Sequence, residues 1–182
     1  IHVCSVWTLL RERMRMTRIV LDAMGGDYAP KAACEGAVLA LRADPELRVL
    51  LAGSRELIQP LVAGDEDVRD RLSIIDAPET ISNNESPALA VRQKKNSAVV
   101  RGMLMLREGE ADGFVSAGST GAVLVGGMLR LGRIPGIERP ALAPLLPGRE
   151  GSFLVIDAGA NVDCKPEYLA QFALMGDAYM RK

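Results

Sequence analysis

The sequence predicts an α/β fold in which a mostly parallel sheet carries helices on both faces. Short β-rich runs alternate with helical stretches of roughly 10–15 residues, which is typical of crossover units. Gly, Pro and Ser mark the boundaries between these runs. Hydrophobic residues make up 48% and charged residues 25% of the 182 residues, the usual balance of a globular chain with a buried core.

The first half of the chain has the clearest element boundaries. Gly25-Gly26 ends the first β-rich run, Pro30 suits the first turn of a helix, and Ser54 is a candidate N-cap. The predicted elements are strands at Arg18–Asp22, Arg48–Ala52 and Leu72–Asp76, a helix carrying Ala33, Ala37, Val38 and Leu41, and a helix around Leu57–Val62.

The second half continues the alternation. Ser97–Arg107 has helical spacing, and the prolines in Pro140–Leu146 favour an edge strand. The other predicted elements are a strand at Gly113–Ala117, a tight loop at Gly118–Gly121, a helix at Ala122–Leu131, a strand at Ser152–Asp157 and a helix that opens at Pro166. The last helix reaches Arg181-Lys182 without a glycine cap, so we expect residues 16–182 to be the N-terminal portion of a longer domain.

Residues 1–15 do not fit this alternation. Their apolar residues precede the basic ones, which is the reverse of a secretory signal. We therefore expect a non-native or disordered extension before a natural start at Met14 or Met16. A genuine amphipathic arm is the alternative.

Composition excludes several classes of function. A net charge of −1 and an aromatic content of 4% argue against nucleic-acid binding. The one histidine is His2, at the start of the chain, which disfavours Ser-His-Asp and Cys-His mechanisms, and we expect no metal site. Cys4, Cys34 and Cys164 form no CxxC pair, as in proteins of a reducing compartment. No apolar run reaches the roughly 18 residues of a membrane span.

Three segments follow predicted strands, and open α/β sheets bind ligands at the carboxyl ends of their strands. The first is Asp22–Asp27, in which Gly25 and Gly26 let the backbone approach a ligand closely. Asp27 is also a candidate cap for the next helix. Spacing alone favours this structural interpretation over ligand binding.

The second segment, Ser116–Gly121, runs from a strand directly into a helix. Ser119 and Thr120 supply hydroxyls and Gly118 allows a tight turn, a combination that suits an anion. The segment matches neither a Walker A loop nor a GxGxxG pattern. An ordinary strand-to-helix turn is about as common, and the paired hydroxyls favour a phosphate site slightly.

The third segment, Asp157–Lys165, is the densest polar cluster after a predicted strand. Asn161, Asp163 and Lys165 stand at every second position, so an extended loop would turn them to one side together. Turn-stabilising contacts of the Asn and Asp side chains are the alternative, which we rank below a functional role.

One basic stretch, Arg92–Ser97, contains Lys94 and Lys95. Such a run could hold phosphate or an acidic partner. A solvated helix face is the more common explanation, and the residues alone favour it.

Five segments in this order closely resemble the PlsX family of bacterial phosphate acyltransferases. They are DAMGGD at Asp22–Asp27, SPALAVRQKKNS at Ser86–Ser97, SAGSTGA at Ser116–Ala122, LGRIPGIERP at Leu131–Pro140 and DAGANVDCKP at Asp157–Pro166. Each segment alone is weak evidence, but five in register over Thr17–Lys182 are highly specific. Residues 1–13 have no counterpart in the family.

The resemblance implies an α/β/α fold like that of isocitrate and isopropylmalate dehydrogenases or of phosphotransacetylases. It implies that inorganic phosphate attacks the thioester of an acyl-[acyl carrier protein]. The resulting acyl phosphate would serve a glycerol-3-phosphate acyltransferase in phospholipid biosynthesis, and no cofactor is implied. Family members are homodimers of the cytoplasm that make peripheral contact with the inner membrane surface.

Carried onto this chain, the resemblance implies catalytic roles for Lys165, Asn161, Asp163 and Lys95. It implies phosphate or substrate binding by Asp22, Gly25, Gly26, Asp27, Lys94, Ser97, Ser116, Gly118, Ser119, Thr120, Gly121, Asp157 and Gly159. The basic stretch thereby changes from a solvated face to part of a site. Because phosphate is itself the nucleophile, the reaction needs a phosphate cradle and donors for the carbonyl oxyanion.

The chain departs from the family pattern at three positions. Tyr28 and Tyr168 stand where the family commonly has His, and Ser119 stands where Asn is common. At Tyr28 and Tyr168 the chain therefore has no imidazole for proton transfer. We expect the chain to be inactive alone, because it ends about midway through the family's length. The alternatives are a dehydrogenase-like enzyme of related fold and a non-catalytic fragment that binds acyl carrier protein.

Overall fold

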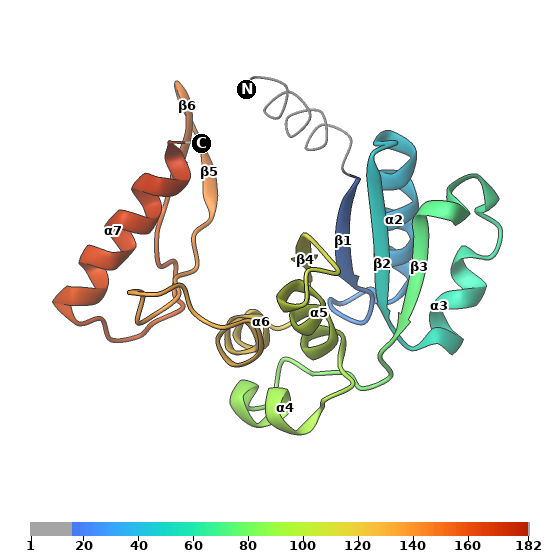
Figure 1. Cartoon of the computed structure of the whole chain (residues 1–182), viewed down its shortest axis with the longest axis horizontal. Helices are drawn as coiled ribbons and strands as arrows, with labels where there is room; N and C mark the ends of the chain where they lie inside the picture. Colours follow the sequence, from blue (N-terminus) through green and yellow to red (C-terminus); the bar gives the residue numbers. More distant parts are fainter. Residues whose placement is uncertain (1–15, 182) are drawn as a thin grey trace, which may run out of the picture. The chain divides into compact units, whose positions relative to one another are not determined.

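The computed structural model describes residues 16–181, which divide into two compact units (Figure 1). The N-terminal unit extends to Leu131, the C-terminal unit begins at Gly132, and each is described by itself. The extension expected over residues 1–15 lies outside the described residues.

A parallel sheet of four strands forms the centre of the N-terminal unit. In sheet order β3-β2-β1-β4, the strands are Leu72–Asp76, Leu47–Gly53, Thr17–Asp22 and Gly113–Val115. Val20 of β1 pairs with Leu50 of β2 on one side and with Phe114 of β4 on the other. Because the strands are parallel, their carboxyl ends share one edge of the sheet, which brings the segments after β1 and β4 together.

Helices cover both faces of this sheet, as the sequence predicts. α2 and α3 pack on one face with the 3-10 helix η1, and α5 packs on the other. Within residues 16–131, the helices are α2 (Lys31–Ala43), α3 (Arg55–Val62), η1 (Glu66–Arg71), α4 (Pro87–Gln93), α5 (Ala98–Arg107), α6 (Thr120–Gly126) and the π-helical turn η2 (Gly127–Leu131).

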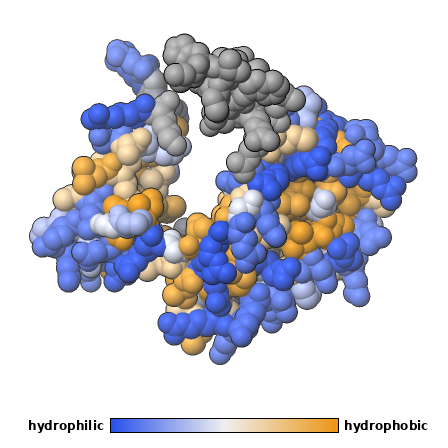
Figure 2. Space-filling model, in the orientation of Figure 1, coloured by the Kyte–Doolittle hydropathy of each residue, from blue (hydrophilic) through white to orange (hydrophobic). Residues whose placement is uncertain are grey.

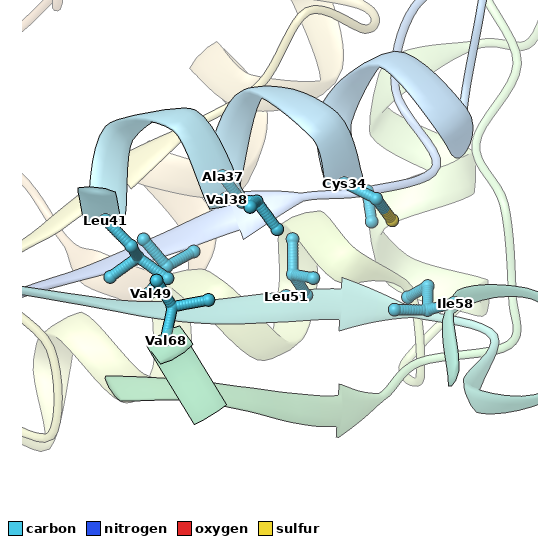
Figure 3. Close-up of a cluster of buried hydrophobic side chains, with 9 residues drawn as sticks. Cys34, Ala37, Val38, Leu41, Val49, Leu51, Ile58 and Val68 are labelled. Carbon is cyan, nitrogen blue, oxygen red and sulfur yellow. The ribbon is translucent and has the colours of Figure 1, made fainter. Parts of the chain in front are cut away.

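The alternation of side chains along β2 explains the two layers. Val49 and Leu51 point into the α2 layer, whereas Leu50 and Ala52 belong to the cluster on the α5 side. A strand buried on both faces is apolar without interruption, as this part of β2 is. Figure 3 shows the α2 layer, which is made by Cys34, Ala37, Val38, Leu41, Val49, Leu51, Ile58 and Val68.

The C-terminal unit consists of an antiparallel hairpin and one long helix. Its elements are β5 (Leu145–Gly148), β6 (Gly151–Leu154) and α7 (Pro166–Met180). In the described part of this unit, only Tyr168 and Phe172 are buried. Apolar residues stay at the surface of both units, where Figure 2 shows them in orange. None of the helices within residues 16–181 has the length and apolar character to cross a bilayer.

The hairpin corrects two predicted strands. The strand predicted at Pro140–Leu146 is Leu145–Gly148, and the one predicted at Ser152–Asp157 is Gly151–Leu154. The two pair with each other in antiparallel fashion and do not join the parallel sheet. A short turn joins them, and Gly151 at φ 129° supplies the backbone conformation that the turn needs.

Two further boundaries differ at the strand that leads to the second predicted loop. The strand predicted at Gly113–Ala117 ends at Val115, and the helix predicted at Ala122–Leu131 begins at Thr120. Its last part, Gly127–Leu131, is π-helical. Beyond Val115, the side chain of Ser116 bonds to Asp22, the last residue of β1, as described below.

The expected cap at Ser54 is also corrected. Ser54 occupies the N-cap position of α3, but its side chain makes no capping hydrogen bond. Asp76 at the end of β3 takes this role, because its Oδ1 accepts from the backbone N–H of Arg55 at 3.1 Å.

Candidate functional site

A chain of hydrogen bonds joins the carboxyl ends of β1 and β4. Ser116 Oγ donates to Asp22 Oδ2 at 2.8 Å and accepts from the backbone N–H of Gly118 at 3.0 Å. Asp22 Oδ1 accepts from the backbone N–H of Met24 at 3.0 Å. Asp22 and Ser116, both expected to bind substrate, therefore fasten the two loops to each other.

Gly25 fits against these loops because it has no side chain. A Cβ at this position would lie 2.7–2.9 Å from three polar atoms, namely Asp22 Oδ2, Gly118 N and Ser116 Oγ. Gly26 has φ 98°, a conformation that side chains rarely adopt. The close approach that the sequence predicts at Gly25 is thus an approach to the neighbouring loop of the same chain.

Burial governs the protonation of Asp22. The residue is only 6% exposed. Burial raises the pKa of its carboxyl above the ordinary aspartate value, while hydrogen bonds from Ser116 and from two backbone N–H groups act in the opposite direction. Perturbed carboxyls of this kind are enriched at functional sites.

A hollow of about 280 Å³ adjoins Asp22 and Ser116. Most of its lining is apolar and small, including Ala29, Ala33 and Ala117. Asp27 and Tyr28 also line it and are exposed to solvent, Tyr28 to 81%. Asp27, Asp22 and the two glycines, all predicted as site residues, therefore border one hollow at the strand ends.

At the start of α6, the hydroxyls of Ser119 and Thr120 differ in their hydrogen bonds. Ser119 Oγ caps the helix by accepting from the backbone N–H of Ala122 at 3.3 Å. Gly121 packs so closely on Pro87 that a Cβ there would lie 2.9 Å from the proline Cγ. Thr120 is exposed, and among residues 16–181 its hydroxyl has no hydrogen-bond partner. Thr120 is therefore a hydroxyl of this loop that is available to a ligand, and Ser119, which only accepts in its cap, keeps its O–H as a donor.

The basic stretch contains two lysines in different surroundings. Lys94 Nζ donates to the backbone oxygen of Thr80 at 2.6 Å and forms an ion pair with Glu85 at 2.7 Å. The hydrogen bond from Lys94 Nζ to the Glu85 carboxylate is the main cause that lowers the pKa of Glu85. Ser97 is buried and caps α5. Lys95 is exposed, so it is the lysine whose charge faces solvent.

A small cavity brings three predicted residues together. It holds about 10 Å³, roughly the space of one water molecule. Asp22, Ser97 and Ser119 line it, together with Glu79 and Thr80. The carboxyl ends of the strands thus meet the starts of α5 and α6 at one point.

The third predicted loop, in the C-terminal unit, is organised by Asp157 and Asn161. Asp157 Oδ1 accepts from Ala160 N and Asn161 Nδ2, and Oδ2 accepts from Asn161 N, each at 3.2 Å. Asn161 Nδ2 also donates to the backbone oxygen of Pro140 at 3.1 Å. Asp157 has φ 61° and Gly159 has φ 96°, so the backbone reverses within a few residues. Both predicted polar residues shape the loop.

Asp163 and Lys165 remain exposed beyond this turn. Lys165 is the N-cap residue of α7, and its Nζ lies 6.0 Å from the centre of the Tyr168 ring. Cys164 lies between them with its Sγ 3.7 Å from Asp157 Oδ2. Loss of water and the charge of Asp157 raise the pKa of this thiol, which disfavours the nucleophilic thiolate. Within residues 16–181, no group of three or more His, Cys, Asp or Glu side chains could hold a metal ion.

Arg139 is a residue next to this loop that the sequence analysis did not single out. Its Cζ lies 5.9 Å from the centre of the Tyr168 ring. The residue falls in the fourth PlsX-like segment, for which the motif implied no role. The only local signal for Arg139 is its position next to Pro140. Tyr168, whose ring Arg139 contacts, is 29 positions away in the sequence.

Comparisons with known proteins agree with the fold and with the motifs. The family model described as "Fatty acid synthesis protein" matches residues 17–182. A phosphate acyltransferase of Clostridium tetani is 47% identical over 165 residues, which are 91% of this chain and 49% of that protein. One of Clostridium beijerinckii is 48% identical over 165 residues, 91% of this chain and 50% of that protein. The chain therefore spans about half the length of these curated relatives.

Among solved structures, a phosphotransacetylase from Streptococcus pyogenes has a similar fold. The TM-score is 0.62, and the match covers 96% of this chain and 57% of that one. At 20% sequence identity, this likeness concerns the fold alone. It agrees with the phosphotransacetylase-like architecture predicted from the sequence.

Proposed function

The chain belongs to the fatty acid synthesis protein family, and from this membership we propose that it is the N-terminal portion of a phosphate acyltransferase. The resemblance to PlsX in five sequence segments is confirmed by the family match and by relatives named phosphate acyltransferase. The proposal concerns the reaction and the residues that carry it.

The proposed reaction is acyl transfer from acyl-[acyl carrier protein] to inorganic phosphate. A phosphate oxygen attacks the thioester carbonyl carbon, and the carbon–sulfur bond then breaks. The carrier protein leaves with the sulfur, which takes up a proton, and acyl phosphate is released. A glycerol-3-phosphate acyltransferase would consume this product, and the complete enzyme would act in the cytoplasm as a homodimer with peripheral membrane contact.

The observation that supports this chemistry best is the state of the candidate nucleophiles. The Ser116 hydroxyl already donates to Asp22, the Ser119 hydroxyl caps α6, and the pKa of Cys164 is raised. Neither Ser119 nor Cys164 is activated for attack on a carbonyl, and the carboxyl that accepts from Ser116 is buried and already bonded to two backbone N–H groups. A reaction in which the substrate phosphate is the nucleophile needs no such group.

The exposed polar groups suit the remaining requirements. Phosphate carries about two negative charges near neutral pH, so a partly dry cleft must supply cations and hydrogen-bond donors. Lys95 and the Thr120 hydroxyl are exposed groups of these types in the N-terminal unit, and Lys165 is one in the C-terminal unit. Asn161 and Asp157 would hold the loop that carries Lys165 in shape. Asp163 would be the catalytic carboxylate two positions before Lys165.

Complementation with the missing half tests the proposal. The 182-residue chain is mixed with the second half of the Clostridium tetani relative, and acyl phosphate is trapped with hydroxylamine while the released carrier thiol is counted. We expect no product from either half alone, and phosphate-dependent product in equal amount to thiol from the mixture. Thiol release that does not depend on phosphate would show a thioesterase instead. Reduction of a nicotinamide in place of acyl phosphate would favour the dehydrogenase-like alternative.

A further inference from the structure

Two cations of the C-terminal unit converge on one aromatic ring. Arg139 Cζ lies 5.9 Å and Lys165 Nζ 6.0 Å from the centre of the Tyr168 ring. Tyr168 is buried, with 9% exposed, whereas both cations are exposed. Within residues 16–181, neither cation forms an ion pair with a carboxylate. Both cations therefore lie against one ring, and among the described residues no carboxylate is bound to either.

Arg139 is fixed in place from both sides. The backbone N–H of Glu138 donates to Gln171 Oε1 of α7 at 2.8 Å. The backbone oxygen of Pro140 accepts from Asn161 Nδ2 at 3.1 Å. The backbone at Arg139 is thus anchored to the helix that carries Tyr168 and to the loop that carries Lys165.

The carboxylates of the same loop make a second cation necessary for an anion site. Both oxygens of Asp157 accept hydrogen bonds from the loop itself. Asp163 is exposed, and its negative charge raises the pKa of the Cys164 thiol while the positive charge of Arg139 lowers it. Asp157 and Asp163 carry two negative charges that Lys165 alone does not offset, so an anion site at this loop requires Arg139 as a second cation.

We propose that Arg139 and Lys165 together bind the phosphate substrate, with Tyr168 as the platform that sets their spacing. This assignment rests on the proposed function and adds a residue to it. The guanidinium of Arg139 presents parallel N–H donors that match two phosphate oxygens, and the ammonium of Lys165 supplies a point charge.

Tyr168 suits this platform better than the histidine common at this position. The face of a phenol ring carries partial negative charge and attracts cations, and the phenol stays neutral near pH 7. An imidazole gains a proton near its pKa of about 6.5 and would then repel Arg139 and Lys165. Tyr168 thus presents a neutral ring face to Arg139 and Lys165 near neutral pH.

Direct phosphate binding tests the assignment without an activity measurement. Inorganic phosphate is titrated into the ¹⁵N-labelled 182-residue chain, and the amide shifts of residues 157–168 give the dissociation constant. Arg139→Gln should raise this constant about tenfold or more, because a charged hydrogen-bond donor is lost. Arg149→Gln is the matched control, since Arg149 is an exposed arginine on the β5–β6 turn of the same unit, and it should change the constant less than twofold.

The platform is tested with two substitutions of Tyr168. Tyr168→Phe keeps the ring face and should bind phosphate as the wild type does, whereas Tyr168→Leu should weaken binding. Amide spectra without phosphate check that each variant is folded.

Each outcome decides between the two proposals. If Arg139→Gln binds phosphate as tightly as Arg149→Gln, the role of Arg139 is wrong, while phosphate bound at the loop still agrees with the proposed function. If phosphate shifts no amide of residues 157–168 in the wild type, the paired-cation site is wrong, and the acyl phosphate assay decides the function separately.

Discussion

The two units of the chain position similar loops by different means. In both, a strand is followed by a polar loop and then by a helix start. In the N-terminal unit, this loop rests on a core that includes Val20, Leu51 and Ala52, each at 0% exposure. In the described part of the C-terminal unit, two buried side chains, Tyr168 and Phe172, form the whole buried set.

This difference shows what fixes functional geometry in each unit. The N-terminal loops are placed by the parallel sheet, and the half-buried hydrogen bond from Ser116 to Asp22 then holds them together. The C-terminal loop is placed mainly by bonds from side chains to the backbone, made by Asp157, Asn161 and Gln171. Truncation of one apolar side chain should therefore damage the C-terminal unit far more completely than the N-terminal unit.

Phe172→Ala should have the largest effect. Phe172 is 2% exposed, and removal of a buried phenylalanine costs roughly 3–5 kcal/mol. With so little else buried, the C-terminal unit should lose its ordered amide spectrum while the resonances of the N-terminal unit persist. Leu174→Ala is the control on the same helix, since Leu174 is 68% exposed. A variant that keeps the α7 amide dispersion would show that the polar contacts alone hold the unit.

Gly25→Ala should come next, as a steric change at the locked loops of the N-terminal unit. The added Cβ would press on three polar atoms at 2.7–2.9 Å, and we expect a loss of roughly 1–3 kcal/mol in unfolding free energy. Gly36→Ala is the matched control: nothing lies within 4 Å of its Cβ position in α2, so it should stabilise by about 0.5–1 kcal/mol. Urea unfolding measures both. Equal urea midpoints for the two variants would mean that the loops after β1 and β4 move apart without a cost in free energy.

The sequence alone predicts the strands of the parallel sheet, but it does not predict the hydrogen-bond partners of the polar residues. Continuous apolar runs and glycine breaks located β1, β2 and β3 to within a residue or so, since burial on both faces leaves a local pattern. No local pattern shows whether Ser116 faces a ligand or Asp22, because these residues are 94 positions apart. Arg139 was missed for the same reason, and the hairpin β5–β6 was read as two independent strands.

Asp22→Asn should change the pH dependence of stability by a smaller amount. The folded-state pKa of Asp22 is raised, so its contribution is fully present below the unfolded value of about 3.9 and is lost as pH rises through the folded value. Asparagine does not titrate and retains an oxygen acceptor. The stability of the variant relative to wild type should therefore increase with pH across this window. Urea unfolding at a series of pH values measures it, and a constant difference would show a carboxyl that is charged without penalty in the folded state.

The smallest effect should separate two adjacent lysines of the N-terminal unit. Lys94 Nζ contacts the Thr80 backbone oxygen at 2.6 Å and Glu85 at 2.7 Å, whereas Lys95 is exposed. Lys94→Ala should lower the urea midpoint slightly, because residues 80–85 lose a tether to α4. Lys95→Ala should leave the midpoint unchanged.

Salt separates an electrostatic tether from a packing effect in this pair. Because the Lys94–Glu85 contact lies near the surface, about 1 M NaCl should screen it and bring the two variants together. In the complemented enzyme the order should reverse: Lys95→Ala should reduce acyl phosphate formation more than Lys94→Ala does, since only Lys95 presents a charge with no carboxylate bound to it among the described residues. Equal loss of activity in both variants would mean that Lys94 exchanges Glu85 for phosphate during the reaction, and the contrast between a structural and a functional lysine would then be wrong.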